Sequence, residues 1–155
     1  MTATASSTLG NDLLRSAARL SRWASRHASF DVPFAQARLL ALLDELGPSR
    51  VSVLAAADNS SQPTTTAQLQ RLAASGWVRR ASDPDDARAT VVSLSDEGRA
   101  ALENVRRARL AVLSPALEQL DETGLDRVRI AVEVINELLA AAADTPVHHP
   151  TRKDG

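Results

Sequence analysis

The sequence contains no cysteine, and this absence excludes several kinds of chemistry at once. Disulfide bonds, zinc sites with thiolate ligands and switches that depend on a reactive thiol all require this residue. Aromatic residues are also scarce, at 3% of the chain, whereas hydrophobic residues make up 44%. Alanine and leucine dominate the hydrophobic set and favour helices, so the composition predicts a mainly helical protein.

Long apolar runs are missing as well. The longest one, residues 138–143, falls far short of the roughly 20 residues that span a membrane. Residues 1–8 are small and polar and lack the basic-then-apolar pattern of a secretory signal. We therefore expect a cytoplasmic protein that has no membrane partner.

A strong charge of one sign is absent too, because the net charge of the chain is −1. The two signs are nevertheless unevenly distributed. Residues 1–109 hold 14 arginines and 11 acidic residues, whereas residues 110–155 hold 4 basic and 8 acidic residues. The first part therefore carries a net charge of +3, which leaves a local basic face available for the phosphates of a nucleic acid.

Patterns of a catalytic or cofactor site are not found. The chain has three histidines, of which His148 and His149 lie near its end. There is no glycine-rich phosphate loop, nucleophile elbow or metal-ligand spacing. We expect no enzyme activity, no metal and no cofactor.

The middle of the chain has the pattern of two helices joined by a brief turn. Residues 51–57 fit one short helix, and residues 59–61 interrupt it and offer caps for another. Pro63 is tolerated in the first turn of that next helix, which is expected to end at Gly76. The order of helix, turn and helix predicts a helix-turn-helix.

After this motif the spacing of apolar residues no longer fits a helix. Residues 77–81 and 90–94 predict two short strands, and a polar, turn-forming segment at residues 82–89 lies between them. A hairpin with so long a polar tip is typical of a wing.

Two helices are predicted before this centre. Apolar residues recur at helical spacing from Leu9 onward, and Pro33 stands at the expected first position of a second helix. Gly47 and Pro48 then stop that helix. Residues 1–8 are expected to form a disordered tail.

Two more helices are predicted after the centre. Ser95 can cap a long helix that Pro115 kinks or splits, and a turn at residues 121–124 precedes the last helix. The apolar faces of these outer helices are hard to bury within one copy of the chain, so they are the natural material of a dimer interface. Residues 144–155 are expected to form a second disordered tail.

The segment around the hairpin resembles the signature of a known family. Gly76-Trp77-Val78-Arg79-Arg80 is followed by Asp86-Ala87-Arg88 and by Val92-Ser93-Leu94-Ser95-Asp96-Glu97-Gly98. This is similar to the pattern G-[LW]-V-x-R, D-x-R and v-x-L-T-x-x-G of the MarR-type (multiple antibiotic resistance) transcriptional regulators, with serine where threonine is usual. Leu54-Ala55 also resembles the scaffold helix of that family. The resemblance is most specific across residues 39–102.

The resemblance implies a mainly helical fold with a small β-hairpin wing. It places a winged helix-turn-helix at residues 33–98 and dimerisation helices at residues 9–32 and 99–143, together one unit over residues 9–143. A two-fold dimer of this kind presents two recognition helices about 34 Å apart, the spacing of successive major grooves. The implied partners are double-stranded DNA with a palindromic operator and a second copy of the chain.

The same resemblance implies roles for individual residues. The helix that starts at Ser61 would enter the major groove with short polar side chains, and Arg80 would lie at the base of the wing. Arg88 at the wing tip would reach the minor groove, and Asp86 would fix its guanidinium. The predicted DNA-binding residues are Ser61, Gln62, Thr64, Thr65, Thr66, Gln68, Arg71, Arg80, Asp86 and Arg88.

Members of the family commonly hold anionic or phenolic, largely apolar ligands between the dimerisation helices and the winged domain. The resemblance therefore implies a repressor that a small ligand relieves, by favouring a dimer with wrongly spaced recognition helices. The residues predicted around such a crevice are Trp23, Arg26, His27, Phe30 and Phe34.

Two other interpretations stay open at this point. Arg71 is the only basic residue of the predicted recognition helix, and this low basicity also fits a winged-helix module that binds another protein. A DNA-binding protein without an effector would keep the same DNA-binding residues and have a collapsed crevice. Taken alone, Asp86 and Arg88 also fit an ordinary surface ion pair.

Overall fold

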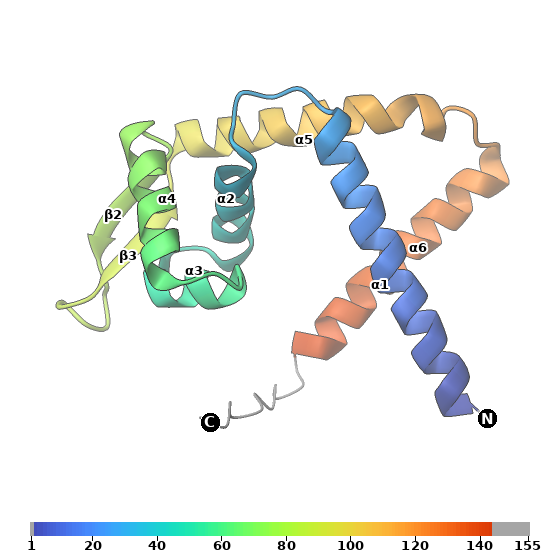
Figure 1. The fold of residues 1–155 in the computed structure, drawn as a ribbon, viewed down its shortest axis with the longest axis horizontal. Coiled ribbons are helices and arrows are strands. Elements are labelled where there is room, and N and C mark those ends of the chain that lie inside the picture. The colour runs from blue at the N-terminus through green and yellow to red at the C-terminus, as the bar shows by residue number, and fades with distance from the viewer. Residues whose placement is uncertain (1, 144–155) are drawn as a thin grey trace. The chain divides into compact units, whose positions relative to one another are not determined.

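The helices and strands follow the order predicted for a winged helix-turn-helix (Figure 1). The structure is a computed structural model that describes residues 2–143, and the chain divides into two compact units between Leu113 and Ser114. The predicted fold class, mainly helical with a small hairpin, is confirmed. The elements are α1 (Thr2–His27), α2 (Phe34–Leu46), β1 (Ser49–Arg50), α3 (Val51–Ala57), α4 (Gln62–Ala74), β2 (Val78–Ser82), β3 (Thr90–Leu94), α5 (Asp96–Leu117) and α6 (Glu122–Ala143).

Buried apolar side chains from α2, α3, α4, both strands of the hairpin and α5 form the core of the first unit. Leu69 and Leu72 of α4 are three residues apart, so they fall on the same face of their helix. Burying a side chain of this size stabilises the fold by about 1.5–3 kcal/mol relative to leaving it exposed. This shared core holds α4 against the hairpin. The largest fully buried apolar residues are Leu39, Leu40, Leu54, Leu69, Leu72 and Val92.

A three-stranded antiparallel sheet with the order β1-β3-β2 carries the wing. In the hairpin, Val78 pairs with Leu94 and Ser82 with Thr90, so both strands are five residues long. The two strands lie where the sequence predicts them, with one shift of a residue in β2. The third strand, β1, was not predicted, because two residues are too short for a period of two to be visible.

One junction joins α4, the hairpin and α5, and it consists of Gly76, Trp77, Ser95 and Gly98. The hydroxyl of Ser95 accepts a hydrogen bond from the Gly98 amide at 3.0 Å, which is the predicted cap of α5, and donates one to the Gly76 carbonyl at 2.6 Å. The Ser95 amide donates to the Trp77 carbonyl at 3.1 Å. Because Ser95 is 2% exposed, these bonds form away from water, and the end of α4 is fixed to the start of α5.

Glycines end two helices where the sequence predicts a stop. Gly47 and Gly76 have φ values of 72° and 74°, in the left-handed region that favours glycine. The Gly47 amide donates to the Leu43 carbonyl at 3.0 Å. Each glycine therefore lets the chain leave its helix at little steric cost.

Three predicted boundaries are wrong. Residues 2–8, expected in a disordered tail, belong to α1, because this segment of small residues has no proline to stop the helix. Pro33 occupies the N-cap position of α2, without a side-chain capping bond, and is not the first residue of the helix. The turn expected at residues 121–124 is shorter, because the Asp121 carboxylate accepts from the Gly124 amide at 2.7 Å and caps α6.

Pro115 lies inside α5, which continues to Leu117, although the chain divides into its two units close to this proline. The single unit expected over residues 9–143 contains this division. The tail expected at residues 144–155 lies outside the described residues. Among the residues that the structure describes, no helix combines the length and the apolar character needed to cross a membrane.

The close approach at Gly98 gives a stability prediction. A Cβ atom at this position would lie 1.9 Å from the Trp77 carbonyl oxygen, and backbone cannot move aside as a side chain can. We predict that Gly98→Ala destabilises the protein by about 3 kcal/mol or more, at the upper end of overpacking effects, and lowers its Tm. Thermal unfolding followed by circular dichroism measures this.

Gly10→Ala is the matched control, because nothing lies within 4 Å of a Cβ there. Inside α1, alanine is favoured over glycine by about 1 kcal/mol, so the Tm of this variant should stay the same or rise. A Gly98→Ala protein as stable as the wild type would contradict the packing of α5 on Trp77.

Candidate nucleic-acid interface

The first turn of α4 presents short polar groups to solvent. Ser61, Gln62 and Thr64 are exposed, and the Ser61 side chain caps the helix by accepting from the Thr64 amide at 3.2 Å. The Ser61 and Thr64 hydroxyls also lie 2.8 Å apart in a hydrogen bond. These hydroxyls and the side-chain amide of Gln62 together suit phosphate oxygens and base edges.

Further along α4 the predicted residues differ in exposure. Arg71 is exposed, whereas Thr66 and Gln68 are half-buried. Thr65 is 1% exposed, and its hydroxyl is hydrogen-bonded to the Ser60 hydroxyl at 2.7 Å. Thr65 therefore holds the turn against α4 and cannot contact DNA as predicted, because the helical period turns its side chain into the core.

The hairpin lies beside α4 and carries the predicted arginines (Figure 1). Arg80 is exposed on β2, opposite Val92 of β3. Arg88 is exposed in the loop between the strands and forms no ion pair within residues 2–143. Its guanidinium is therefore available to a phosphate or a groove.

Asp86 does not hold the Arg88 guanidinium as predicted. Its carboxylate accepts a hydrogen bond from the Arg88 backbone amide at 3.1 Å, in the short-range pattern typical of aspartate in turns. The Asp86 carbonyl accepts from the Ala89 amide at 2.9 Å. Asp86 thus shapes the loop and leaves the Arg88 side chain unrestrained.

An ion pair at the root of this loop was missed by the sequence analysis. Nε of Arg50 in β1 donates to Oδ2 of Asp83 at 2.5 Å, and the Asp85 amide donates to Oδ1 of Asp83 at 2.9 Å. The hydrogen bond from Asp85 and that from Arg50 lower the pKa of Asp83, although burial opposes them. The bond to Asp83 and its negative charge raise the pKa of Arg50, so both groups are charged at neutral pH.

The turn at Asp83 has a sequence signal, because the run Asp83-Pro84-Asp85 is typical of a turn closed by an aspartate side chain. The ion pair between Asp83 and Arg50 has no such signal in the sequence. The two residues are 33 positions apart, and only the β1–β3 pairing brings them together.

The five residues predicted around a ligand crevice separate into two groups. Phe30 and Phe34 line a cavity of about 110 Å³ in the first unit. Trp23, Arg26 and His27 are not among the residues that line this cavity. The other residues that line the cavity are Ser25, Ala37, Arg38, Ala41, Leu102, Val105, Arg106 and Arg109.

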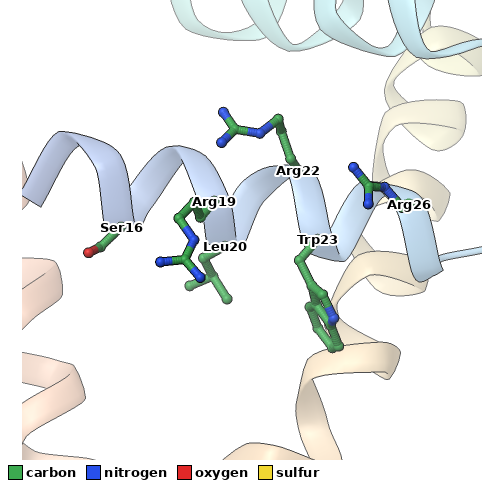
Figure 2. Close-up of a pocket in the computed structure, with 6 residues that line it drawn as sticks. All are labelled: Ser16, Arg19, Leu20, Arg22, Trp23 and Arg26. Carbon is green, nitrogen blue, oxygen red and sulfur yellow. The ribbon is translucent and has the colours of Figure 1, made fainter.

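Trp23 and Arg26 line a wider hollow along α1, of about 510 Å³ (Figure 2). Figure 2 shows Arg22 and Arg26 extending to one side of α1 and Trp23 to the other. The Trp23 ring stacks on the His27 ring at a centroid distance of 4.8 Å, and the Trp23 carbonyl lies 2.8 Å from Nδ1 of His27. Trp23 and His27 are therefore partners of each other.

Three arginines border the cavity at Phe30 and Phe34, and sequence analysis did not place them there. Arg106 donates to Asp44 at 2.7 Å, and Arg38 is paired with Asp58. Arg109 donates from Nη2 to the Ser21 hydroxyl at 2.9 Å, but its Nε is buried without a hydrogen-bond partner among the described residues. An apolar cavity with guanidinium groups at its border can accept an aromatic anion.

The geometry of α4 and the hairpin defines a winged helix-turn-helix DNA-binding protein, and the comparisons agree. The model of the MarR family matches residues 34–90. The chain is 32% identical over 139 residues to an uncharacterised HTH-type transcriptional regulator of Mycobacterium bovis, with 89% of this chain and 95% of that protein covered. An HTH-type transcriptional regulator of Mycobacterium tuberculosis matches with the same identity and coverage.

Solved structures give the same result. A putative transcriptional regulator from Pseudomonas aeruginosa superposes with a TM-score of 0.73 at 30% identity, over 86% of this chain and 94% of that one. A MarR family protein from Bacillus stearothermophilus shares the fold, with a TM-score of 0.69 at 20% identity over 90% and 99% of the two chains. This chain belongs to the MarR family. It is a DNA-binding transcriptional regulator and not an enzyme.

Proposed function

We propose that this protein is a homodimeric repressor that binds a palindromic operator through α4 and the wing, and that a small aromatic anion releases it from DNA. The observation that carries the proposal is the pairing of an exposed polar helix start at Ser61 with an exposed arginine at the tip of a hairpin, Arg88. The first group suits a major groove and the second a minor groove.

The proposed DNA contacts are made by predicted residues whose side chains are at least partly exposed to solvent. The start of α4 is the part of that helix with several exposed hydroxyl and amide groups, so it reads base edges and phosphates in the major groove. Arg88 enters the adjacent minor groove, and Arg80 approaches the backbone from the base of the wing. The proposed contact residues are Ser61, Gln62, Thr64, Thr66, Gln68, Arg71, Arg80 and Arg88.

A second copy of the chain is proposed because α6 is apolar around most of its circumference. Asp126, Arg129, Glu133 and Glu137 recur at intervals of three and four residues and define one polar stripe. No residue of α6 is buried within one copy. Apart from Arg127, the remaining sides of the helix are largely apolar and require partners to cover them. The exposed large apolar residues of α6 are Leu125, Val128, Ile130, Val132, Val134, Leu138 and Leu139.

Charge supports the same assembly. α1 carries four arginines and one aspartate, whereas residues 114–143 carry six acidic and two basic residues. These opposite signs favour contact between α1 of one copy and the C-terminal helix of the other. α1 also exposes Leu9, Leu14 and Leu20, which need a partner surface for the same reason as α6.

The proposed effector is a single aromatic ring that carries a carboxylate or a phenolate. A cavity of about 110 Å³ bordered by Phe30 and Phe34 is smaller than the apolar cavity of about 150 Å³ that binds benzene, so it limits the effector to one ring, with the charged group at the cavity's border. The buried Nε of Arg109 has no hydrogen-bond partner within residues 2–143 and can donate to the anion. Binding would favour a dimer whose recognition helices are wrongly spaced for DNA. A repressor acts on the chromosome, so we propose the cytoplasm as its compartment.

The wing contact is tested by Arg88→Ala. We predict that the wild type retards a DNA fragment from upstream of its own gene, with a steep dependence on salt, and that Arg88→Ala weakens binding about tenfold. Fluorescence anisotropy over a salt series measures the affinity and the slope. The lost phosphate or groove contact should reduce the slope of log K against log salt.

Arg129→Ala removes the same charge from the polar stripe of α6 and serves as the control. Its affinity for the fragment should equal that of the wild type. A wild-type protein that binds no duplex at low salt would favour the alternative, a winged-helix module that binds another protein.

The dimer is tested by Val132→Glu. A carboxylate in an apolar interface is left without a partner, so we predict that sedimentation equilibrium gives a dimer for the wild type and a monomer for this variant. Glu133→Gln, on the neighbouring polar stripe, should remain a dimer. A monomeric wild type at micromolar concentration would contradict the proposal.

The effector is tested with benzoate as the probe. At ten times its Kd, a ligand that binds only the folded state stabilises it by about 1.4 kcal/mol, which raises Tm by about 3–6 °C for a chain of this size. Arg109→Met should lose this shift, and benzyl alcohol, which has the ring without the charge, should give less of it. If no aromatic acid shifts Tm or weakens DNA binding, the protein binds DNA without an effector of this class.

A further inference from the structure

Arg50 connects the tip of the wing to the edge strand β1 through a short ion pair with Asp83 and a longer one with Asp86. Arg50 belongs to β1, and its backbone pairs with Val91 of β3. Its guanidinium reaches the loop between β2 and β3, where Nε donates to the Asp83 carboxylate at 2.5 Å. The Asp83 side chain is 9% exposed and that of Arg50 is 43% exposed, so the carboxylate end of this bond is shielded from most of the solvent.

Asp83 in turn closes the loop at its root. The Asp83 amide donates to the Ala89 carbonyl at 3.0 Å, which joins the first and last residues of the tip. The Asp83 carboxylate also accepts from the Asp85 amide at 2.9 Å. A displacement of Asp83 would therefore break the closure of the loop and the turn inside it.

The closed loop carries Arg88. Inside it, Asp86 accepts from the Arg88 amide through its carboxylate and from the Ala89 amide through its carbonyl. The connections from Arg50 to the Arg88 backbone thus run through the carboxylates of Asp83 and Asp86. The Arg88 side chain itself is exposed and forms no bond of this network.

We propose that Arg50 is a positioning residue for DNA binding: it holds Asp83, and through it the wing tip, in the orientation from which Arg88 enters the minor groove. This inference rests on the proposed wing contact. Its physical basis is preorganisation, because a loop that is already ordered loses less conformational entropy when it binds.

A direct phosphate contact is a poorer role for Arg50. Its Nε is occupied by Asp83, and its Nη2 lies 3.9 Å from the Asp86 carboxylate. Two carboxylates next to one guanidinium leave a net negative charge, which repels phosphate. The low pKa of Asp83 and the high pKa of Arg50 agree with a pair that stays charged at neutral pH.

A double-mutant cycle tests the inference. The four proteins are the wild type, Arg50→Met, Arg88→Ala and the double variant, all measured by anisotropy on the fragment from upstream of the gene. We expect Arg50→Met to weaken binding about fivefold and Arg88→Ala about tenfold. Because Arg50 acts through Arg88, the double variant should bind about as Arg88→Ala does.

A salt series separates positioning from direct contact. In the Arg88→Ala background, Arg50→Met should leave the slope of log K against log salt unchanged, whereas loss of a phosphate contact would reduce it by about one. Losses that multiply to about fiftyfold in the double variant, or a reduced slope, overturn the inference. Binding unaffected by Arg88→Ala would instead contradict the proposed wing contact on which the inference depends.

Asp83→Asn provides a second route to the same interaction. It keeps the shape of the side chain and removes its charge, so it should weaken DNA binding in the wild type and have no further effect in Arg50→Met. Arg129→Met is the matched control, since it breaks an ion pair to Asp126 on α6 by the same substitution. Tm values of all variants, measured in parallel, show that each protein is folded at the temperature of the assay.

Discussion

The buried hydroxyl of Ser95 makes the contact on which the architecture depends. It caps α5 through the Gly98 amide and holds the Gly76 carbonyl, where α4 ends. Trp77, between them in space, donates from its amide to the Leu72 carbonyl of α4 and accepts from the Ser95 amide. Only glycine fits at position 98, because any Cβ would overlap the Trp77 carbonyl. The recognition helix, the wing and the long helix thus start or end at one rigid point. A change in the direction of α5 must therefore move the two elements proposed to touch DNA.

Two further constraints act on either side of this junction. Toward the wing, the ion pair between Arg50 and Asp83 ties the hairpin loop to β1, so a short strand at the edge of the sheet controls a loop that projects from it. Toward the C-terminus, α6 offers apolar side chains on most of its surface and buries none within one copy. The first constraint favours a preformed DNA-binding surface, and the second favours a partner chain. Together they support a dimer that presents two preformed DNA-binding surfaces, each made of a recognition helix and a wing.

The sequence was most informative where the signal is local. A cap within residues 59–61, a cap at Ser95 and stops at Gly47 and Gly76 were predicted, and the structure has Ser61 as the first of these caps and confirms the other three, because capping depends on residues within one helical turn. It was less informative about exposure and distant pairing. Thr65 belongs to a run of three threonines, and its spacing of four and seven residues from Leu69 and Leu72 is the signal, overlooked in the prediction, that places it on the buried face. Arg50 and Arg109 acquire their neighbours only through tertiary packing, so no pattern in the chain could have indicated them. The residues predicted around one crevice are likewise divided in the structure: Trp23 and Arg26 of α1 line one hollow, whereas Phe30 and Phe34, which lie beyond the end of α1, line another cavity.

The central claim is that two copies of the chain bind one duplex with two recognition helices and two wings. Selection of bound duplexes from a random pool by the wild-type protein tests it most directly. We predict enrichment of an inverted repeat whose half-sites have centres about one helical turn apart, 10–10.5 base pairs or a multiple of this. A/T-rich segments should flank the half-sites, where the narrow minor groove attracts arginine. Enrichment of a single, unrepeated half-site, or no enrichment over the starting pool, would contradict the account.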